Sequence, residues 1–251
     1  MKIIGLYITG VILLLSSCCK DNRTLPDILG IVTVDLDANK GVVRTRESLI
    51  GNLICDGLKS ELDRRGESAD FAILNGGAIR YDTEKRPSGI YPAGQITSAM
   101  VDEMIPFGDA NVIVAINGKQ LKSIFERSAA QLPQAEGPFL QVSKELTVLI
   151  DTSKQPQIIN DLVDPPVIVT EGKRIASIKI NHVEYDTNAT YRVIVNSFLA
   201  EEKGNDGYVV FRNLPPNQKS NLGDEQALVI KQYIRLKTPL TPTLQGRIVY
   251  K

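Results

Sequence analysis

Residues 71–80 read FAILNGGAIR and contain the sharpest change of local structure in this sequence. The first four residues form a short apolar run of the kind that lies buried in a sheet, and Asn75-Gly76-Gly77 ends it. Glycine reaches backbone angles that other residues resist, so we expect an unusual turn at the two glycines. Arg80 then lies on the loop that leaves the end of a buried strand, where side chains commonly reach a cleft.

Helical spacing precedes this strand, and strand-like segments follow it. Apolar residues recur every three or four positions from Ile50 to Leu62, and Gly66 lies near the C-terminal end of that predicted helix. Further helices are predicted over 95–106, from 121 onward and over 225–237, and a strand over 112–116. The segments 146–150, 175–180 and 191–195 alternate or run apolar, which suggests one antiparallel sheet.

The N-terminus carries the features of an export signal. Met1-Lys2 supplies a positive start, and residues 3–15 form an apolar run that is too short to span a bilayer permanently. The run ends in LSSC at 15–18, which resembles the processing site of bacterial lipoproteins, where the cysteine becomes the lipidated N-terminus. An ordinary secretory leader with an incidental Cys18 is the alternative.

These features predict the organisation and location of the chain. We expect a lipoprotein signal peptide over 1–17, a lipidated tether over 18–26 with the lipid on Cys18, and one domain over 27–251. The protein would then be an exported bacterial lipoprotein, anchored to a membrane and facing the periplasm or the cell surface.

Composition excludes several classes of function. The 29 basic and 29 acidic residues balance, so no strong field draws the protein to nucleic acid. With Cys18 lipidated, Cys19 and Cys55 make an unsuitable pair, so we expect no structural disulfide and a small buried side chain at Cys55. The single histidine, His182, lies between two strand-like runs, which favours a hairpin turn over a metal ligand.

Six groups of residues, in this order, resemble the C-terminal domain of the 5′-nucleotidase / UDP-sugar hydrolase family, a periplasmic or cell-surface group that dephosphorylates nucleotides. They are RTRE at 44–47 with GNLI at 51–54, NGGAIR at 75–80, IPFG at 105–108, FLQVS at 139–143, NSFLA at 196–200 and NDGY at 205–208. Any one of them is weak, whereas six in the family's order are specific. The resemblance implies an α+β fold, with mixed β-sheets layered with α-helices, that binds the substrate.

The resemblance also implies two stacking residues. In the family two Phe side chains sandwich the base, and the matching positions are Phe107 and Phe198. Taken alone, a Phe is more often part of a core than of a binding site. However, Phe107 lies between a proline and a glycine, and Phe198 ends a predicted strand before a polar loop, so both rings can face a cleft.

The same resemblance also implies the polar residues of the binding site. Asn75 matches a position that hydrogen-bonds the base, although Asn-Gly is also a turn signal. Arg44 and Arg80 match arginines that reach the phosphate and ribose, since a planar fork of donors suits oxyanions. Arg46 either assists them or is a solvated charge at a helix start. Asp206 matches the carboxylate that accepts hydrogen bonds from the ribose hydroxyls.

The chain departs from the family pattern just before Asp206. The family usually passes from Phe-Leu-Ala directly into Gly-Gly-Asp-Gly, whereas this chain has extra residues in the run AEEKGNDG over 200–207. Asn205 replaces a glycine, and Asn is the least costly replacement where φ is positive. The position of Asp206 is therefore the open point of the predicted site.

Full-length family members carry, ahead of this domain, a metallophosphatase domain whose two metal ions activate water. Such a site needs several His, Asp and Asn ligands, and this sequence has one histidine and no Asp-x-His or Asn-His-Glu signature. We therefore expect no catalytic residue, no metal site and no cofactor in this chain, and no hydrolysis by the isolated protein. Divalent metals are expected only in a partner phosphatase.

Three hypotheses of function remain open. In the leading one the chain is the nucleotide-binding subunit of a split 5′-nucleotidase and docks with a separately encoded metallophosphatase. In the second it is a stand-alone lipoprotein that binds a nucleotide or nucleoside, with no role in hydrolysis. In the third it is a surface interaction protein with a vestigial pocket. The expected partners are a nucleotide or nucleoside, the phosphatase and, through the lipid, the membrane, but no nucleic acid.

Overall fold

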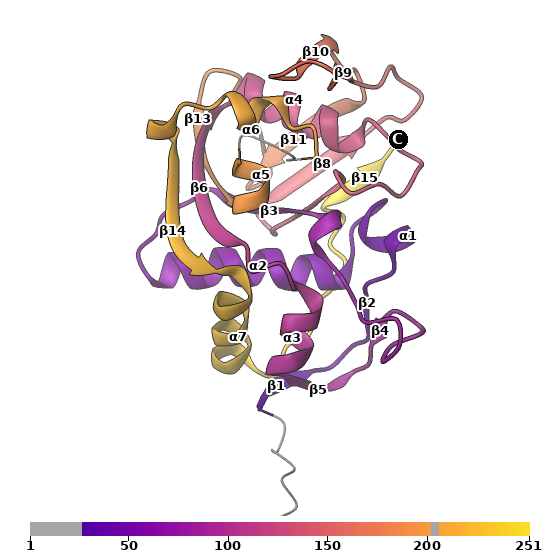
Figure 1. The fold of residues 1–251 in the computed structure, drawn as a ribbon, viewed down its shortest axis with the longest axis vertical. Helices are drawn as coiled ribbons and strands as arrows, with labels where there is room; N and C mark the ends of the chain where they lie inside the picture. The colour runs from indigo at the N-terminus through magenta and orange to yellow at the C-terminus, as the bar shows by residue number, and fades with distance from the viewer. Residues whose placement is uncertain (1–26, 202–205) are drawn as a thin grey trace, which may run out of the picture.

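The computed structural model describes residues 27–201 and 206–251 (Figure 1). The predicted signal peptide, Cys18 and the tether lie outside the described residues, and so does Asn205. Within the described part of the chain, none of the helices is long and apolar enough to cross a membrane.

The described residues form short strands and helices that alternate along the chain. The strands are β1 (Ile28–Val32), β2 (Leu36–Asp37), β3 (Phe71–Asn75), β4 (Ile90–Tyr91), β5 (Gly94–Thr97), β6 (Ala110–Asn117), β7 (Leu140–Val142), β8 (Leu146–Ile150), β9 (Ile158–Asn160), β10 (Val167–Thr170), β11 (Ile175–Ile180), β12 (Val183–Glu184), β13 (Thr190–Asn196), β14 (Lys219–Glu225) and β15 (Ile248–Tyr250). The helices are α1 (Lys40–Val43), α2 (Leu49–Arg64), α3 (Ser98–Met104), α4 (Gly118–Ala129), α5 (Ser197–Ala200), α6 (Val209–Asn213) and α7 (Gln226–Lys237), with 3₁₀ turns η1 (Gly76–Ala78) and η2 (Pro216–Gln218).

A five-stranded sheet in the order β14-β6-β13-β3-β7 forms the centre of the molecule. In it β13 pairs with β3 in parallel and with β6 in antiparallel fashion. Alternate residues of β3 enter two different cores: Phe71 and Ile73 belong to one, and Ala72 and Leu74 to the other. Because side chains of a strand alternate between the faces of a sheet, this sheet is buried on both faces.

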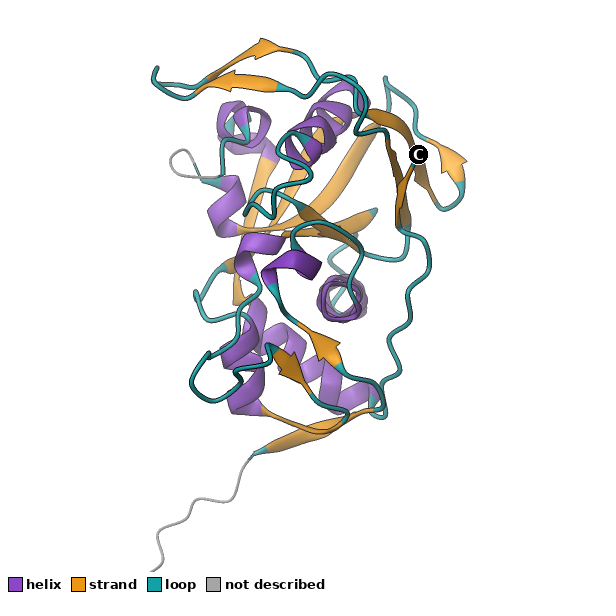
Figure 2. Cartoon of the chain, turned by 90° about the vertical axis from the view of Figure 1, so that its right-hand side faces the viewer, coloured by secondary structure: helices purple, strands orange, loops and turns teal. Residues whose placement is uncertain are grey.

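Helices cover one face of the sheet, and a helix and a second sheet cover the other (Figures 1 and 2). The lower core in Figure 1 lies between the sheet, α2 and α7, and the upper core lies between the sheet, α4 and the four-stranded sheet β12-β11-β8-β15. Cys55 of α2 is fully buried in the lower core and free. Mixed sheets layered with helices are the α+β architecture that the sequence predicts.

Several sequence-based elements are confirmed, and two are partly wrong. The helices predicted over 50–62 and 225–237 correspond to α2 and α7, and His182 lies in the exposed turn between β11 and β12 with φ 68°. The segment 191–195, however, joins β3 and β6 rather than β8 and β11. The helix predicted over 95–106 begins only at Ser98, because residues 94–97 pair with β1 and the Thr97 side chain caps α3.

The expected reason for the glycines at 76 and 77 is also wrong. Neither has a positive φ, and both lie in the 3₁₀ turn η1. A Cβ atom on Gly76 would instead lie 2.3 Å from the carbonyl oxygen of Val43, and one on Gly77 would lie 2.9 Å from the side-chain nitrogen Nδ2 of Asn75. The glycines therefore permit close approach of other atoms to this turn rather than unusual backbone angles.

Candidate functional site

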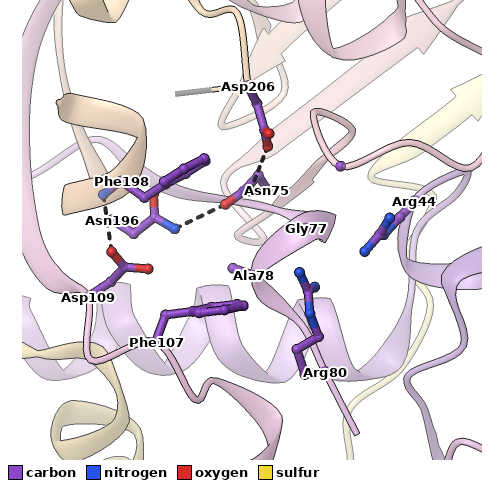
Figure 3. A pocket seen from close by; sticks show the side chains of 11 residues that line it. Arg44, Asn75, Gly77, Ala78, Arg80, Phe107, Asp109, Asn196, Phe198 and Asp206 are labelled. Atoms are coloured by element: carbon purple, nitrogen blue, oxygen red, sulfur yellow. Dashed lines mark hydrogen bonds between the residues drawn. The ribbon is translucent and has the colours of Figure 1, made fainter. Parts of the chain in front are cut away.

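The pairing of three strands places the candidate site. Because β3 and β13 run parallel, their last residues, Asn75 and Asn196, lie at the same edge of the sheet, and the antiparallel β6 begins there at Ala110. The segments that flank these strand ends surround a cavity of about 480 Å³ (Figure 3). The cavity is lined by Arg44, Asn75, Gly77, Ala78, Arg80, Phe107, Asp109, Gly137, Asn196, Phe198 and Asp206.

Two phenylalanine rings form opposite walls of this cavity (Figure 3). Phe107 lies in the loop between α3 and β6 and is 57% exposed, whereas Phe198 is half-buried in the single-turn helix α5. The prediction that Phe198 ends a strand is wrong, because β13 stops at Asn196, whose side chain caps α5 by accepting a hydrogen bond from the amide of Leu199. This cap turns the Phe198 ring toward the cavity instead of continuing the strand.

Two arginines converge on another side of the cavity. The guanidinium carbon of Arg80 lies 4.9 Å from the Phe107 ring centroid, and its Nη1 donates to the carbonyl oxygen of Ile79 at 3.0 Å. Nε of Arg44 is buried and has no hydrogen-bond partner among the described residues. Burial lowers the pKa of Arg80, and the positive charge of Arg44 lowers it further, while Asp206 opposes the shift. Two adjacent guanidinium groups with spare donors are suited to an anion.

A chain of side-chain hydrogen bonds, which we call the asparagine bridge, joins the strand ends to Asp206. Asn196 Nδ2 donates to Asn75 Oδ1 at 3.0 Å, and Asn75 Nδ2 donates to Asp206 Oδ2 at 2.9 Å (Figure 3). Asn75 is 3% exposed, so its amide is largely shielded and is engaged on both its oxygen and its nitrogen. Its observed role is to hold Asp206, and a hydrogen bond from Asn75 to a base stays a prediction.

Asp206 reaches the cavity in spite of the extra residues before it. Its own φ is 56°, and its carbonyl oxygen accepts a hydrogen bond from Arg127 Nε at 2.9 Å. Burial raises the pKa of Asp206, and the hydrogen bond from Asn75 and the charges of Arg127, Arg44 and Arg80 act against this rise. The carboxylate therefore faces the cavity from a partly desolvated position.

The family is decided by comparison with known proteins. The model of the family described as "5′-nucleotidase, C-terminal domain" matches residues 28–213. The chain belongs to this family. In 5′-nucleotidases this domain binds the substrate. The cavity lies among the strand ends of the matched part of the chain.

Individual relatives agree with this assignment. The crystal structure of a 5′-nucleotidase precursor from Thermus thermophilus is similar with a TM-score of 0.74 and 30% identity, over 89% of this chain and 39% of that one. The 5′-nucleotidase of Bos taurus is 31% identical over 227 residues, which cover 88% of this chain and 37% of the relative. A snake venom 5′-nucleotidase from Naja atra is 28% identical over 235 residues, which cover 88% and 40%. The chain thus spans about two fifths of the length of these relatives.

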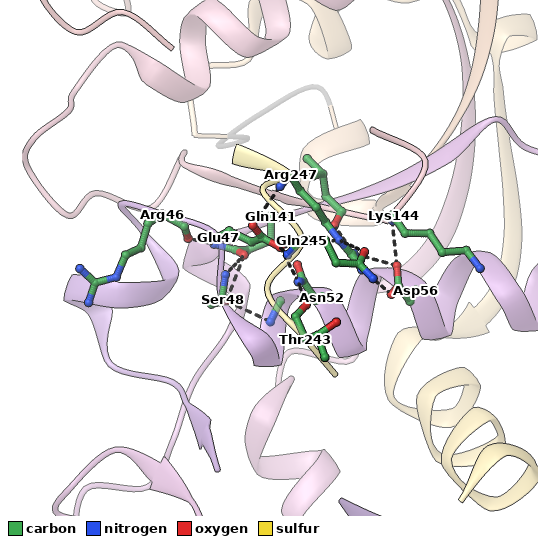
Figure 4. Close-up of polar contacts among 12 residues, drawn as sticks. Arg46, Glu47, Ser48, Asn52, Asp56, Gln141, Lys144, Thr243, Gln245 and Arg247 are labelled. Carbon is green, nitrogen blue, oxygen red and sulfur yellow. Dashed lines mark hydrogen bonds and ion pairs between the residues drawn. The ribbon is translucent and has the colours of Figure 1, made fainter. Parts of the chain in front are cut away.

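Six of the seven residues that the sequence predicted for the site of this 5′-nucleotidase C-terminal domain line the one cavity, namely Arg44, Asn75, Arg80, Phe107, Phe198 and Asp206. Arg46 does not. It is exposed, and Figure 4 shows its side chain pointing away from the neighbouring polar cluster. Sequence analysis missed Asp109 and Asn196, although each lies within two residues of a predicted stacking residue. A polar residue so close to a stacking ring is the signal that could have identified them.

A second group of polar residues, centred on Glu47, supports the fold rather than the cavity (Figure 4). The Glu47 carboxylate accepts hydrogen bonds from Asn52 Nδ2 at 2.7 Å, from the Gln245 amide at 2.8 Å and from the Arg247 amide at 2.9 Å. Arg247 in turn donates to both carboxylate oxygens of Asp56 at 2.8 and 2.7 Å. These contacts fasten the start of α2 to the segment that leads into β15.

The cavity of this 5′-nucleotidase C-terminal domain does not fit a catalytic metal ion. Its two carboxylates, Asp109 and Asp206, come from different segments of the chain and lie apart in Figure 3, and its other charged side chains are guanidinium groups. Among the residues that the structure describes, no three His, Cys, Asp or Glu side chains are grouped so that they could hold a metal.

Proposed function

We propose that this chain is the nucleotide-binding, substrate-recognition subunit of a split 5′-nucleotidase. The observation that carries the proposal is the cavity with two facing phenylalanine rings and two converging arginines. A nucleotide combines a flat base with an anionic phosphate, so one ligand would satisfy both sets of side chains. A volume of about 480 Å³ falls within the usual range for small-ligand sites.

Each residue then has a chemical role toward the nucleotide. The rings of Phe107 and Phe198 stack on the base, an interaction worth about 1–3 kcal/mol per base that tolerates every base. Arg44 and Arg80 bind the phosphate through charge-assisted hydrogen bonds. Asp206 accepts hydrogen bonds from the ribose hydroxyls, and the asparagine bridge holds it in place.

In this proposal hydrolysis takes place on a separately encoded metallophosphatase, which supplies the divalent metals. The presence of a single histidine in the sequence supports this division, because two-metal phosphatase sites draw on several. The sequence up to Cys18 supports an exported lipoprotein that presents the nucleotide at a membrane surface. The isolated chain would bind nucleotide without hydrolysing it.

The test combines binding with a reconstituted assay. AMP binding to the purified full chain is measured by calorimetry, and AMP hydrolysis by a candidate metallophosphatase from the same organism is measured with and without this protein. We expect AMP binding, co-purification of the two proteins and faster hydrolysis with both present. Unchanged hydrolysis with every candidate phosphatase would refute the split enzyme.

A second function, a stand-alone nucleotide- or nucleoside-binding lipoprotein, is favoured by one observation. The two rings, the two arginines and Asp206 together offer groups for the base, the phosphate and the ribose of a nucleotide within this chain. The two candidates differ in the reconstituted assay. Tight AMP or adenosine binding together with no effect on any phosphatase supports the stand-alone binder.

A further inference from the structure

We propose that Asp109 selects the base of the bound nucleotide and favours an amino group over a carbonyl oxygen at the position where adenine and cytosine carry their amino groups. This inference rests on the proposed function and deepens it, since stacking on Phe107 and Phe198 alone accepts any base. Asp109 lines the cavity beside both rings, two residues after Phe107 and at the N-terminal end of the helix that carries Phe198 (Figure 3).

The contacts of Asp109 leave one carboxylate oxygen for a ligand. Oδ1 accepts hydrogen bonds from Ser197 Oγ at 2.9 Å and from the Phe198 amide at 3.2 Å, which fixes the orientation of the side chain. Oδ2 has no hydrogen-bond partner among residues 27–201 and 206–251. Since Asp109 is a lining residue, this second oxygen is the part of the carboxylate that remains for a hydrogen bond in the cavity.

The other polar side chains at this end of the cavity are already engaged. Asn75 binds Asn196 and Asp206, and Asn196 also caps α5. Ser197 Oγ donates to Asp109 and accepts from the amide of Ala110 at 3.1 Å. For a base held between the two rings, Oδ2 of Asp109 is therefore the side-chain acceptor at this end of the cavity that is still free to bind it.

The chemistry of a carboxylate makes this contact selective. An ionised carboxylate only accepts hydrogen bonds. An amino group on the edge of the base would donate to it, whereas a carbonyl oxygen at the same position would face it with a second acceptor and leave it unsatisfied. Buried polar groups left without a partner are the strongest basis for rejecting a close analogue.

The charges in the cavity also fix the direction in which the nucleotide lies. Figure 3 shows Asp109 on one side and Arg44 with Arg80 on the other. A phosphate would be repelled by Asp109 and attracted by the arginines, whereas the amino group of a base can donate a hydrogen bond to Asp109 but not to the arginines, which are donors only. Asp109 and the arginines thus favour the same orientation of one ligand.

The test compares AMP with two close analogues in the purified full chain. Inosine 5′-monophosphate carries a carbonyl oxygen where AMP carries its amino group, and purine riboside 5′-monophosphate carries neither. Because a hydrogen bond to a charged group contributes on the order of a tenfold change or more, we expect AMP to bind at least tenfold tighter than inosine 5′-monophosphate, with the third ligand between them. In Asp109→Asn, which can present an amide NH₂ to the base, this preference should be lost.

Ser197→Ala serves as the matched control, because it removes a support of Oδ1 and leaves the free oxygen. It should weaken all three ligands to a similar extent and keep their ratios, which separates recognition by Asp109 from positioning of Phe198. Equal binding of AMP and inosine 5′-monophosphate by the wild-type protein overturns the inference while leaving the proposed function intact. Failure to bind any of the three overturns the proposed function itself. Should Asp109→Asn not fold, the wild-type ratio alone decides.

Discussion

Replacement of Phe107 by alanine is the most direct test of the proposed stacking site. The ring is 57% exposed and lies outside both clusters of buried residues, so its removal should change the free energy of unfolding by no more than about 0.5 kcal/mol. The ring also lies 4.9 Å from the Arg80 guanidinium carbon, so Arg80 loses a neighbouring aromatic face in the variant.

The loss in binding is expected to be much larger than the loss in stability. Stacking contributes about 1–3 kcal/mol per base, so the dissociation constant for AMP should rise by roughly 5- to 150-fold. Isothermal titration calorimetry measures the binding, and urea unfolding followed by circular dichroism measures the stability. A variant that folds normally and loses affinity places the ring against the ligand.

Two further substitutions separate stacking from simple apolar contact. Phe107→Tyr keeps an aromatic face and should bind AMP nearly as the wild type does. Phe107→Leu keeps apolar bulk without a π-face, so its affinity for AMP should lie between those of Phe107→Ala and Phe107→Tyr. The reasoning is refuted if Phe107→Ala binds AMP with the wild-type dissociation constant, or if Phe107→Leu restores binding as fully as Phe107→Tyr.

Three other predictions concern charge, close approach and pH. Arg44→Ala should weaken AMP binding by at least tenfold and adenosine binding much less, because it removes the proposed phosphate contact. Arg46→Ala should leave AMP binding unchanged, since Arg46 is exposed and does not line the cavity. Calorimetry with both ligands measures the two effects, and equal effects of the two substitutions would contradict the proposed site. Gly76→Ala should lower the free energy of unfolding in urea by about 1–3 kcal/mol, because its Cβ would lie 2.3 Å from a backbone carbonyl oxygen. The control Gly41→Ala should be neutral or stabilising, because a Cβ there would have no atom within 4 Å. Burial raises the pKa of Asp206, so the folded protein loses stability as pH rises through that raised pKa and the carboxyl ionises. Asp206→Asn should therefore have a larger free energy of unfolding than the wild type at pH 7. In urea unfolding below about pH 4, where the carboxyl is protonated in both states, this difference should disappear.

The sequence predicts those parts of the fold that depend on local pattern. The apolar spacing of α2 and the proline after Lys237 give two helices with nearly correct ends. The pairing of β13 could not be predicted in this way, because its apolar run fits an antiparallel neighbour in β11 as well as a parallel one in β3. Which strand it joins depends on the helices that cover each face of the finished sheet.

The site shows the same division between local and distant information. Matched residue groups identify both phenylalanines and both arginines that line the cavity. They do not predict that Asn75 hydrogen-bonds a carboxylate 131 positions away, or that Gly76 is needed because the carbonyl oxygen of Val43 approaches it. Both relations arise only when distant segments meet, so no spacing within the chain encodes them.

The residues that look purely structural also determine how Arg44 is presented to the cavity. Gln141, deep in the fold, donates through Nε2 to the carbonyl oxygens of Val43 at 2.9 Å and Arg46 at 2.7 Å, and its Oε1 accepts from the Ser48 amide at 3.0 Å. These bonds fix the backbone on both sides of Arg44. Because Arg44 Nε has no partner of its own among the described residues, it is this backbone, held by a buried amide, that directs the guanidinium group into the cavity. The residue groups that resemble the family are therefore of two kinds. Some of their side chains line the cavity, and others, such as Gln141, hold the backbone that positions those side chains for the ligand.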